Sequence, residues 1–198
     1  MSLALVLVSA YLLGSIPFSF LVARAFGVQD VRRVGSGNVG ATNVLRSAGR
    51  AAGILALLLD AGKGLAATSF TTWLVPERLD LAALAALAAI LGHMYPPWLR
   101  FQGGKGVATG LGAFAPLVPQ AALGATALFL LTLVATRYVS LSSLIGAVSL
   151  AGLAFVFGSS VHVAWVATVA AGLVAIRHRS NLRRLWGGSE HRAGGGGR

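Results

Sequence analysis

The sequence contains no cysteine, and only five of its 198 residues are acidic. Without cysteine the chain has no disulfide framework, no thiolate nucleophile and no Cys-type metal site. Its four histidines form neither a cluster with carboxylates that could hold a metal nor an H-x-x-x-x-D motif, and there is no G-x-S-x-G nucleophile elbow. We therefore expect a site that works without a metal or any other cofactor.

Charged residues are scarce as well, because only 11% of the chain is Asp, Glu, Lys or Arg, whereas 56% is apolar. The mean hydropathy of +0.79 predicts an integral membrane protein. Sixteen Lys and Arg against five acidic residues give a net charge of +11, which implies anionic partners such as lipid headgroups or phosphorylated substrates. A nucleic acid is not expected, because basic patches interleaved with aromatic platforms are absent from the sequence.

Six apolar runs divide the chain, each bounded by charges, glycine or proline. The first run lacks the basic n-region and the A-x-A cleavage site of a signal peptide and is long enough to cross a bilayer. We therefore expect it to be a retained transmembrane helix. The six runs cover residues 2–23, 51–75, 81–99, 107–136, 139–157 and 161–176.

The fourth run is too long for one straight span, because it holds 30 residues where one helix needs about 20. Pro116 and Pro119 lie near its middle. Lys and Arg of short loops concentrate on the cytoplasmic side of a membrane. If the run forms two helices, nearly all Lys and Arg lie on one side of the membrane. If it forms one helix, Arg137 and the basic tail lie on the opposite side. We predict an all-α protein with seven transmembrane helices, the N-terminus outside and the C-terminus cytoplasmic. The last four helices would be only about 15 to 19 residues long.

We expect one polytopic membrane domain over residues 1–192, acting as a monomer, and a flexible glycine-rich tail at 193–198. The predicted topology gathers four polar, glycine-rich or basic stretches on the cytoplasmic face. Long connections in a compact membrane protein usually carry function. These stretches are 35–46, 103–109, 140–143 and 177–184.

The first stretch, GSGNVGATNVLR, contains the G-x-G-x-x-G pattern of dinucleotide-binding loops. That pattern requires a preceding strand and a βαβ unit, whereas membrane spans flank it here, so we reject a nucleotide site. Glycines still let successive backbone N–H groups converge on an anion, and Arg46 offers a guanidinium fork suited to phosphate. A flexible interfacial loop explains GSGNVG alone equally well. The other candidate binding residues here are Ser36, Gly37, Asn38, Gly40, Thr42 and Asn43.

The second stretch, FQGGKGVATG, places Lys105 among Gly103, Gly104 and Gly106, directly before an apolar helix. Backbone donors and one ammonium at a helix N-terminus form an anion site. The loop is not a Walker A motif, because glycine rather than Ser or Thr follows the lysine. Taken alone, a glycine hairpin with a lysine that sets topology is the more ordinary interpretation.

The third and fourth stretches offer hydroxyl, imidazole and amide groups. A serine turn that includes Ser143 is common between short helices and is weak by itself. In RHRSNLRRL, His178 and Asn181 lie at i and i+3 and so on one helical face. A basic helix end usually anchors lipid headgroups, but this imidazole and amide add hydrogen-bonding chemistry that an anchor does not need.

Two charged residues, Asp60 and Lys63, interrupt an apolar run at i and i+3. Charges inside a span are costly and normally pair within the protein interior. We therefore expect an ion pair that braces the site rather than a catalytic role. His93 lies near the cytoplasmic end of the third span, where we expect a packing or hydrogen-bonding residue.

Together these segments resemble the bacterial acyl-phosphate:glycerol-3-phosphate acyltransferases, the PlsY family. The resemblance covers nearly the whole chain through GSIPFSFLVAR, GSGNVGATNVLR, LDAGKG, LGHMYPPWLRFQGGKGVATGLG, SLSSL and RHRSNLRRLWGGSE. It implies a seven-span enzyme of the bacterial inner membrane with a cytoplasmic site. The implied reaction moves an acyl chain from acyl phosphate to the sn-1 hydroxyl of glycerol 3-phosphate. The products are lysophosphatidate and inorganic phosphate, in the first acylation of phospholipid synthesis.

The resemblance also implies roles for individual residues. Ser36 and Arg46 match the first family motif, which serves catalysis and phosphate binding. Ser143 matches a site serine, and Glu190 matches a structural acidic position that trails the third motif, to which His178 and Asn181 belong. The glycine-rich motif that binds a substrate phosphate matches Gly103, Gly104, Lys105 and Gly106.

Two mechanisms stay open at this point. In direct transfer the substrate hydroxyl attacks the acyl carbonyl, with His178 or the substrate's own phosphate accepting its proton. In the other, Ser36 is transiently acylated with His178 as base. We favour direct transfer, because no third residue is evident to orient the histidine. A transporter of phosphorylated anions is the alternative function, although transporters tend to show repeats and polar groups at the midplane. A structural protein would not require two phosphate sites.

Overall fold

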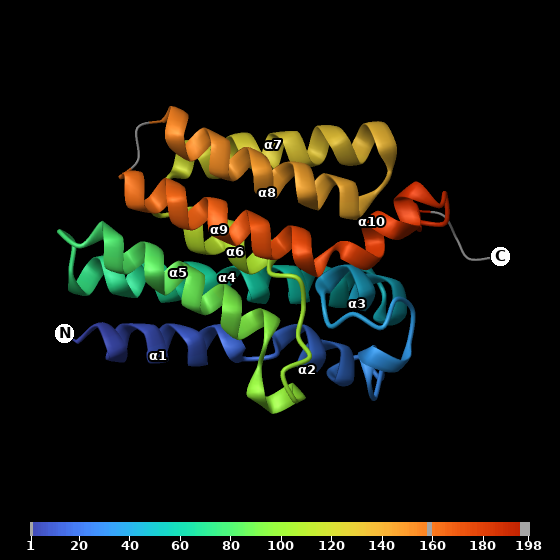
Figure 1. Ribbon diagram of the computed structural model, residues 1–198. Coiled ribbons are helices and arrows are strands. Elements are labelled where there is room, and N and C mark those ends of the chain that lie inside the picture. Colours follow the sequence, from blue (N-terminus) through green and yellow to red (C-terminus); the bar gives the residue numbers. More distant parts are fainter. Residues whose placement is uncertain (1, 158–159, 195–198) are drawn as a thin grey trace. The chain divides into compact units, whose positions relative to one another are not determined.

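The computed structural model describes residues 2–157 and 160–194, and within these residues all regular structure is helical (Figure 1). The chain forms two compact units, residues 1–117 and 118–198, which are described separately below. Of the predicted flexible tail, residues 195–198 lie outside the described residues.

The first unit is a layer of helices in which α1 packs against α5, and α4 packs against α5, α6 and the short helices α2 and α3. The α4–α5 turn lies at one end of this unit, and α2 and α3 lie at the other (Figure 1). Its elements are α1 (Leu3–Ser15), α2 (Phe18–Ala25), η1 (Val31–Arg33), α3 (Ala41–Ala48), α4 (Arg50–Leu74), α5 (Leu79–Met94), η2 (Pro97–Leu99) and α6 (Val107–Phe114).

The second unit packs α8 between α7 and α9, and α10 continues from α9 after a bend of 59°. Large apolar side chains such as Leu131, Val134 and Val156 are exposed on these helices. A soluble protein would bury them, whereas a membrane helix presents them to lipid. The elements are α7 (Pro119–Thr136), α8 (Val139–Val156), α9 (Val161–Arg177) and α10 (Arg179–Trp186).

Five helical segments of the described chain are long and apolar enough to cross a membrane, and the bent α9–α10 pair would make a sixth. The first of them, Leu3–Ala25, is interrupted between α1 and α2 at Pro17. Proline lacks a backbone N–H and its ring clashes with the preceding helical turn, so it breaks the helix here. The run is thus long enough for the one span expected, but it consists of two helices separated at Pro17.

The fourth apolar run is divided into α6 and α7, as the charge pattern predicts. Pro119 is the first residue of α7, where its fixed φ angle and missing N–H suit a helix start. The helices α7, α8 and α9 have 17 or 18 residues, within the predicted range. The expected length is wrong for α6, which has only eight residues and so rises about 12 Å.

Small residues allow close helix packing in the first unit. A Cβ on Gly64 of α4 would overlap the carbonyl oxygen of Thr109, and one on Gly112 of α6 would overlap that of Ala61. Gly14 and Gly92 meet the facing backbone of α5 and α1 in the same way. Because helices in lipid gain little from burying apolar surface, close backbone approach is a main source of their association.

Two of the glycines of α4, Gly64 and Gly62, provide a matched test of this packing. Gly64→Ala should destabilise the protein by about 1–3 kcal/mol, because the new methyl group meets backbone that cannot move aside. Gly62→Ala, at a position with nothing within 4 Å, should be neutral or slightly stabilising because alanine favours helix. Thermal unfolding of the detergent-solubilised variants measures both, and equal midpoints would contradict the packing argument.

Candidate functional site

The loop between α2 and α3 is folded around Asn43, a buried residue of α3. Its amide nitrogen donates to the carbonyl oxygens of Val31 (2.9 Å) and Val34 (3.0 Å), and its amide oxygen accepts from the Ser36 N–H (2.9 Å). The nearby Gly35 has a φ angle of +58°, and a Cβ there would overlap the amide oxygen of Asn43. Asn43 therefore ties the whole loop to the first turns of α3.

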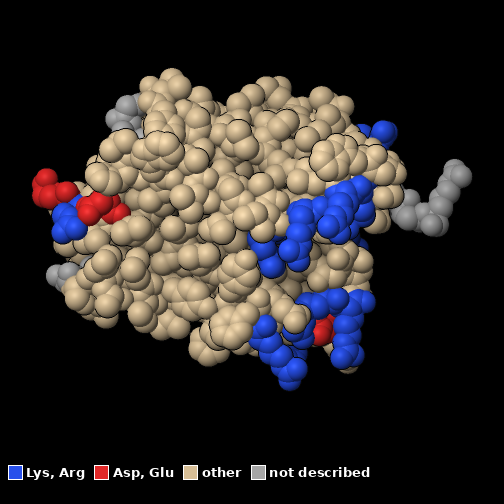
Figure 2. Space-filling model, in the orientation of Figure 1, with Lys and Arg blue, Asp and Glu red and all other residues tan. Residues whose placement is uncertain are grey.

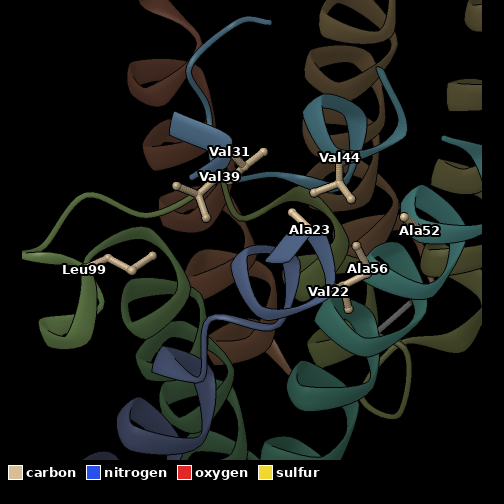
Figure 3. Packing of buried hydrophobic residues seen from close by; sticks show 8 residues of the cluster. All are labelled: Val22, Ala23, Val31, Val39, Val44, Ala52, Ala56 and Leu99. Carbon is tan, nitrogen blue, oxygen red and sulfur yellow. The ribbon is translucent and has the colours of Figure 1, made fainter. Parts of the chain in front are cut away.

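An apolar cluster lies beneath this loop (Figure 3). Val31, Val39 and Val44 come from η1, the loop and α3, and they are almost completely buried. They pack with side chains of α2, α4 and η2, so the loop has its own small core. The cluster consists of Val22, Ala23, Val31, Val39, Val44, Ala52, Ala56 and Leu99.

The predicted binding residues of this loop lie on its outer side. Ser36 and Gly37 are exposed, and Asn38, Gly40 and Thr42 are partly buried. Arg46 is exposed in the last turn of α3, three residues after Asn43 and thus on an adjoining face. The loop therefore presents a hydroxyl and a guanidinium, while the Asn43 amide, expected to bind substrate, is used within the loop.

Asn43→Asp should loosen the loop, because two carbonyl oxygens would then face a carboxylate instead of an amide donor. We expect faster trypsin cleavage after Arg32 and Arg33, and a fall of about tenfold or more in the activity that the resemblance implies. Ser47→Ala, which removes a hydroxyl bonded only to its own helix at the Asn43 carbonyl, is the matched control. Unchanged cleavage in Asn43→Asp would contradict the role of the amide.

The second glycine-rich loop joins η2 to α6 and is bound to the end of α5. The Gly103 N–H donates to the Met94 carbonyl (3.1 Å), and the Gly104 N–H donates to the His93 carbonyl (3.2 Å). These two N–H groups were expected to face an anion, so that expectation is corrected. The geometry suited to an anion lies one residue further, where Lys105 is partly exposed and α6 begins with first-turn N–H groups that have no partner within the helix.

A small pocket lies beside this loop, at the break between α1 and α2. It is lined by both helices of the broken span, by α4, by the end of α5 and by Gly103 and Gly104. Asp60, Lys63 and His93 all reach it. The sequence separation of these residues gives no sign of this convergence.

The ion pair predicted between Asp60 and Lys63 is present and buried, with the two charged atoms 2.9 Å apart. The Ser19 hydroxyl donates to the other carboxylate oxygen (2.5 Å), and the Lys63 ammonium donates to the Ile16 carbonyl (2.8 Å). Ile16 lies at the break of the first span, where backbone carbonyls lose their helical partners. Backbone exposed at a break within lipid must be satisfied inside the protein, so the pair stabilises this break.

The cations of the first unit gather at the end that holds α2, α3 and the glycine-rich loops, whereas the α4–α5 turn carries Glu77, Arg78 and Asp80 at the opposite end (Figures 1 and 2). Asp30 lies among these cations. The hydrogen bond from the Arg32 side chain is the main cause that lowers the pKa of Asp30 to about 2. This carboxylate therefore stays ionised and offsets part of the positive charge.

In the second unit, three side chains converge on Glu190. Ser140 (2.8 Å) and Asn181 (2.6 Å) donate to one carboxylate oxygen, and Arg184 donates to the other (2.7 Å). Burial raises the pKa of Glu190, but the hydrogen bonds from Asn181, Arg184 and Ser140 outweigh it and hold that pKa below its usual range. Glu190 thus joins α8, α10 and the segment after α10.

This carboxylate should make stability depend on pH. A carboxylate whose pKa is lowered by folding stabilises the folded state above its unfolded pKa, about 4.3, and loses that contribution as pH falls through the lower folded value. We expect the difference in unfolding midpoint between wild type and Glu190→Gln to be constant near pH 7 and to shrink below about pH 4. A difference independent of pH would contradict this linkage; thermal unfolding across pH measures it.

His178 does not lie within a continuous helix with Asn181, as the i, i+3 spacing suggests. It is the residue between α9 and α10, at the bend, and both side chains are buried. Its Nδ1 lies 2.8 Å from the Val174 carbonyl oxygen. Because a carbonyl oxygen only accepts, Nδ1 carries the proton and Nε2 is the basic nitrogen of the neutral ring. A backbone carbonyl thus orients the imidazole, which the sequence did not reveal.

Ser143 is buried, and its hydroxyl donates to the Val139 carbonyl of its own helix (2.8 Å). The serine that reaches Glu190 is instead Ser140, which sequence reasoning did not single out. Ser19 was missed in the same way, because a lone serine in an apolar run carries no pattern. Among residues 2–157 and 160–194, no group of three or more His, Asp or Glu side chains has the arrangement of a metal site.

These features define a helical membrane protein with glycine-rich loops and cations suited to phosphate. The chain belongs to the glycerol-3-phosphate acyltransferase family, whose model matches residues 4–188. Among its relatives is the glycerol-3-phosphate acyltransferase of Anaeromyxobacter sp., 48% identical over 195 residues and covering 96% of each chain. That of Cereibacter sphaeroides is 47% identical over 194 residues, covering 97% of this chain and 91% of the relative.

Two solved structures share the fold. One is the glycerol 3-phosphate form of PlsY (YgiH), described as an integral membrane glycerol 3-phosphate acyltransferase. It is 42% identical, with a TM-score of 0.93 over 98% of this chain and 96% of that one. The other is the lysophosphatidic acid form, 40% identical with a TM-score of 0.90 over 97% and 95%. The present chain is thus an integral membrane protein of this acyltransferase family.

Proposed function

We propose that this protein transfers a fatty acyl group from acyl phosphate to the sn-1 hydroxyl of glycerol 3-phosphate. The new ester C–O bond forms at the acyl carbon as its bond to the phosphate oxygen breaks. The hydroxyl proton passes to a base, and 1-acylglycerol 3-phosphate and inorganic phosphate are released. The observation that carries the proposal is the likeness over nearly the whole chain to a fold solved in glycerol 3-phosphate and lysophosphatidic acid forms.

The two units are assigned separate parts of this chemistry. In the first unit, Arg46 and Lys105 neutralise the charge that grows on the departing phosphate, and the Ser36 loop binds phosphate oxygens. In the second unit, Ser143 and Asn181 contact substrate and His178 offers Nε2 as a base. The substrate's own phosphate is the other candidate base. Acyl phosphate is already activated, so little covalent help is needed.

We favour direct transfer over an acyl-serine intermediate, because Ser36 is exposed on a glycine-rich loop that suits binding. The orientation of His178 by the Val174 carbonyl supports its use as a base in either route. A chemical trap separates them: acyl phosphate supplied without glycerol 3-phosphate should release no phosphate burst and leave Ser36 unmodified by mass spectrometry. An acyl adduct on Ser36 would overturn direct transfer.

We also propose seven membrane helices, with the N-terminus outside and the glycine-rich loops in the bacterial cytoplasm. The break between α6 and α7 and the gathering of cations at one end of the first unit support this topology. The seventh crossing requires the short α6, so the bilayer would be thinned or the helix shielded by protein at that point. Cysteine labelling of the α4–α5 turn and of the α2–α3 loop from either side tests the orientation.

The activity test uses purified protein, glycerol 3-phosphate and either palmitoyl phosphate or palmitoyl-CoA. We expect lysophosphatidate and inorganic phosphate from the acyl phosphate and none from the thioester. Product from the thioester alone would overturn the assigned donor. No product from either donor, in protein shown to be folded, would favour a transporter of phosphorylated anions, for which uptake into vesicles is the direct measurement.

A further inference from the structure

The His93 side chain lies directly under the second glycine-rich loop. A Cβ on Gly104 would overlap Nε2 of this imidazole, so glycine is the residue that allows the loop backbone to approach the ring. His93 is also bound to the loop through its backbone, since its carbonyl oxygen accepts from the Gly104 N–H. The position of the Gly104 backbone is therefore set by His93, next to the Met94 carbonyl that holds Gly103.

The other edge of the imidazole faces Asp60. His93 Nδ1 lies 3.5 Å from the carboxylate oxygen that pairs with Lys63, and both side chains are buried. Ser19 fixes the second oxygen of the carboxylate. The ring is thus held between Asp60 of α4 and the Gly104 backbone of the loop.

The same part of α4 also positions α6. Gly64 lies one turn after Asp60 and contacts the Thr109 carbonyl in the first turn of α6. Lys105 lies between these two fixed points, the Gly104 backbone and the α6 N-terminus. A shift of the His93 ring would therefore move the backbone that leads to Lys105 relative to the first turn of α6.

We propose that His93, held by Asp60, is a positioning residue that sets the phosphate-binding geometry of the Gly103–Gly106 loop. This inference rests on the proposed function and assigns to the Asp60–His93 pair a part in substrate affinity beyond stability. The pair acts through the loop backbone, so its loss should weaken binding of the one phosphate substrate that this loop holds.

The first test is a steady-state comparison of His93→Leu, His93→Asn and the matched control His162→Leu, an exposed histidine. His93→Leu should raise KM for one phosphate substrate about tenfold, with a smaller change in kcat and in KM for the other. His93→Asn keeps a donor near the Nδ1 position and should recover most of the affinity. Unchanged KM values in folded His93→Leu would overturn the proposal, as would an equal rise in both with a matching fall in the unfolding midpoint.

A second test does not depend on His93→Leu being stable. Gly104→Ala should raise the same KM, because the new methyl group collides with the ring. His93→Ala removes the ring and with it the collision. The rise in KM caused by Gly104→Ala should therefore be several-fold smaller in the His93→Ala background than in wild type. Equal costs in the two backgrounds would overturn the proposal.

A binding measurement separates this inference from the proposed function. Glycerol 3-phosphate or inorganic phosphate should raise the unfolding midpoint of wild type in a concentration-dependent way. The ligand concentration that gives half of the maximal rise in midpoint should be about tenfold higher for His93→Leu than for wild type. If wild type is inactive but still shows this shift in midpoint, the proposed reaction is wrong and the phosphate-binding role of the loop stands. If wild type is active but His93→Leu leaves its KM values unchanged, the proposed reaction stands and the role of His93 is wrong.

Discussion

Arg46→Ala and Lys105→Ala should each lower the rate of lysophosphatidate formation by about 100-fold or more, while the protein still inserts and folds. Removing one preorganised donor for developing negative charge typically costs about 100- to 1,000-fold in kcat. Lys105 lies in a loop whose backbone is held by His93 and Met94, and Arg46 lies in α3, whose Asn43 holds the preceding loop in place. The alanine variants therefore remove the charge and leave the loop in place.

The control is Arg78→Ala, at the opposite end of the first unit, where the arginine pairs with Asp80 in an exposed turn. Its rate should stay within about twofold of wild type, because exposed pairs contribute little. The measurement is release of phosphate and lysophosphatidate from palmitoyl phosphate, normalised to folded protein by size-exclusion profile. A near-normal rate in Arg46→Ala or in Lys105→Ala would contradict the phosphate-binding role proposed for that residue.

Asp60→Ala and Lys63→Ala should each destabilise the protein by about 3–5 kcal/mol, because each leaves the opposite charge buried without its partner. The lysine would retain only the Ile16 carbonyl, and the carboxylate would retain Ser19 and His93. The unfolding midpoint of detergent-solubilised protein, by heat or denaturant, measures the loss.

The double variant Asp60→Asn/Lys63→Met provides the decisive comparison. It removes both charges and keeps side chains of similar volume. Its loss in free energy of unfolding should therefore be much smaller than the sum of the losses in the two single alanine variants. Matched single variants Asp60→Asn and Lys63→Met complete the cycle. Additive costs would show that the two charges act independently, in contradiction of the buried pair.

Part of the division of the chain into helices was predictable because the causes are local. Pro119 starts α7 through its own ring geometry, and the i, i+3 spacing of Asp60 and Lys63 places both on one helical face. The break at Pro17 has a local cause too, but it was not predicted. The bend at His178 was not predictable in this way, since neither proline nor glycine marks it. The contact between Ser140 and Glu190, 50 residues apart, has no local signal either.

The glycine motifs show the same limit at the candidate site. Sequence reasoning correctly placed the second glycine-rich loop, with Lys105, directly before a helix. It did not predict α3, the short helix that carries Arg46. It assumed that the glycine N–H groups point outward to an anion. In the structure, the Gly103 and Gly104 N–H groups are bonded to α5, and these residues are glycine because the chain and the His93 ring leave no room for a side chain.

The sequence by itself determined the membrane class, the positions of most helix ends and the residue types available for phosphate chemistry, because each follows from composition or from neighbours along the chain. The tertiary structure decided which of those groups bind the protein itself and which face outward. Asn43, Gly104 and Glu190 illustrate this, since their roles depend on side chains and backbone brought together from distant segments. Such contacts arise only when helices pack, and packing depends on the shapes of whole faces.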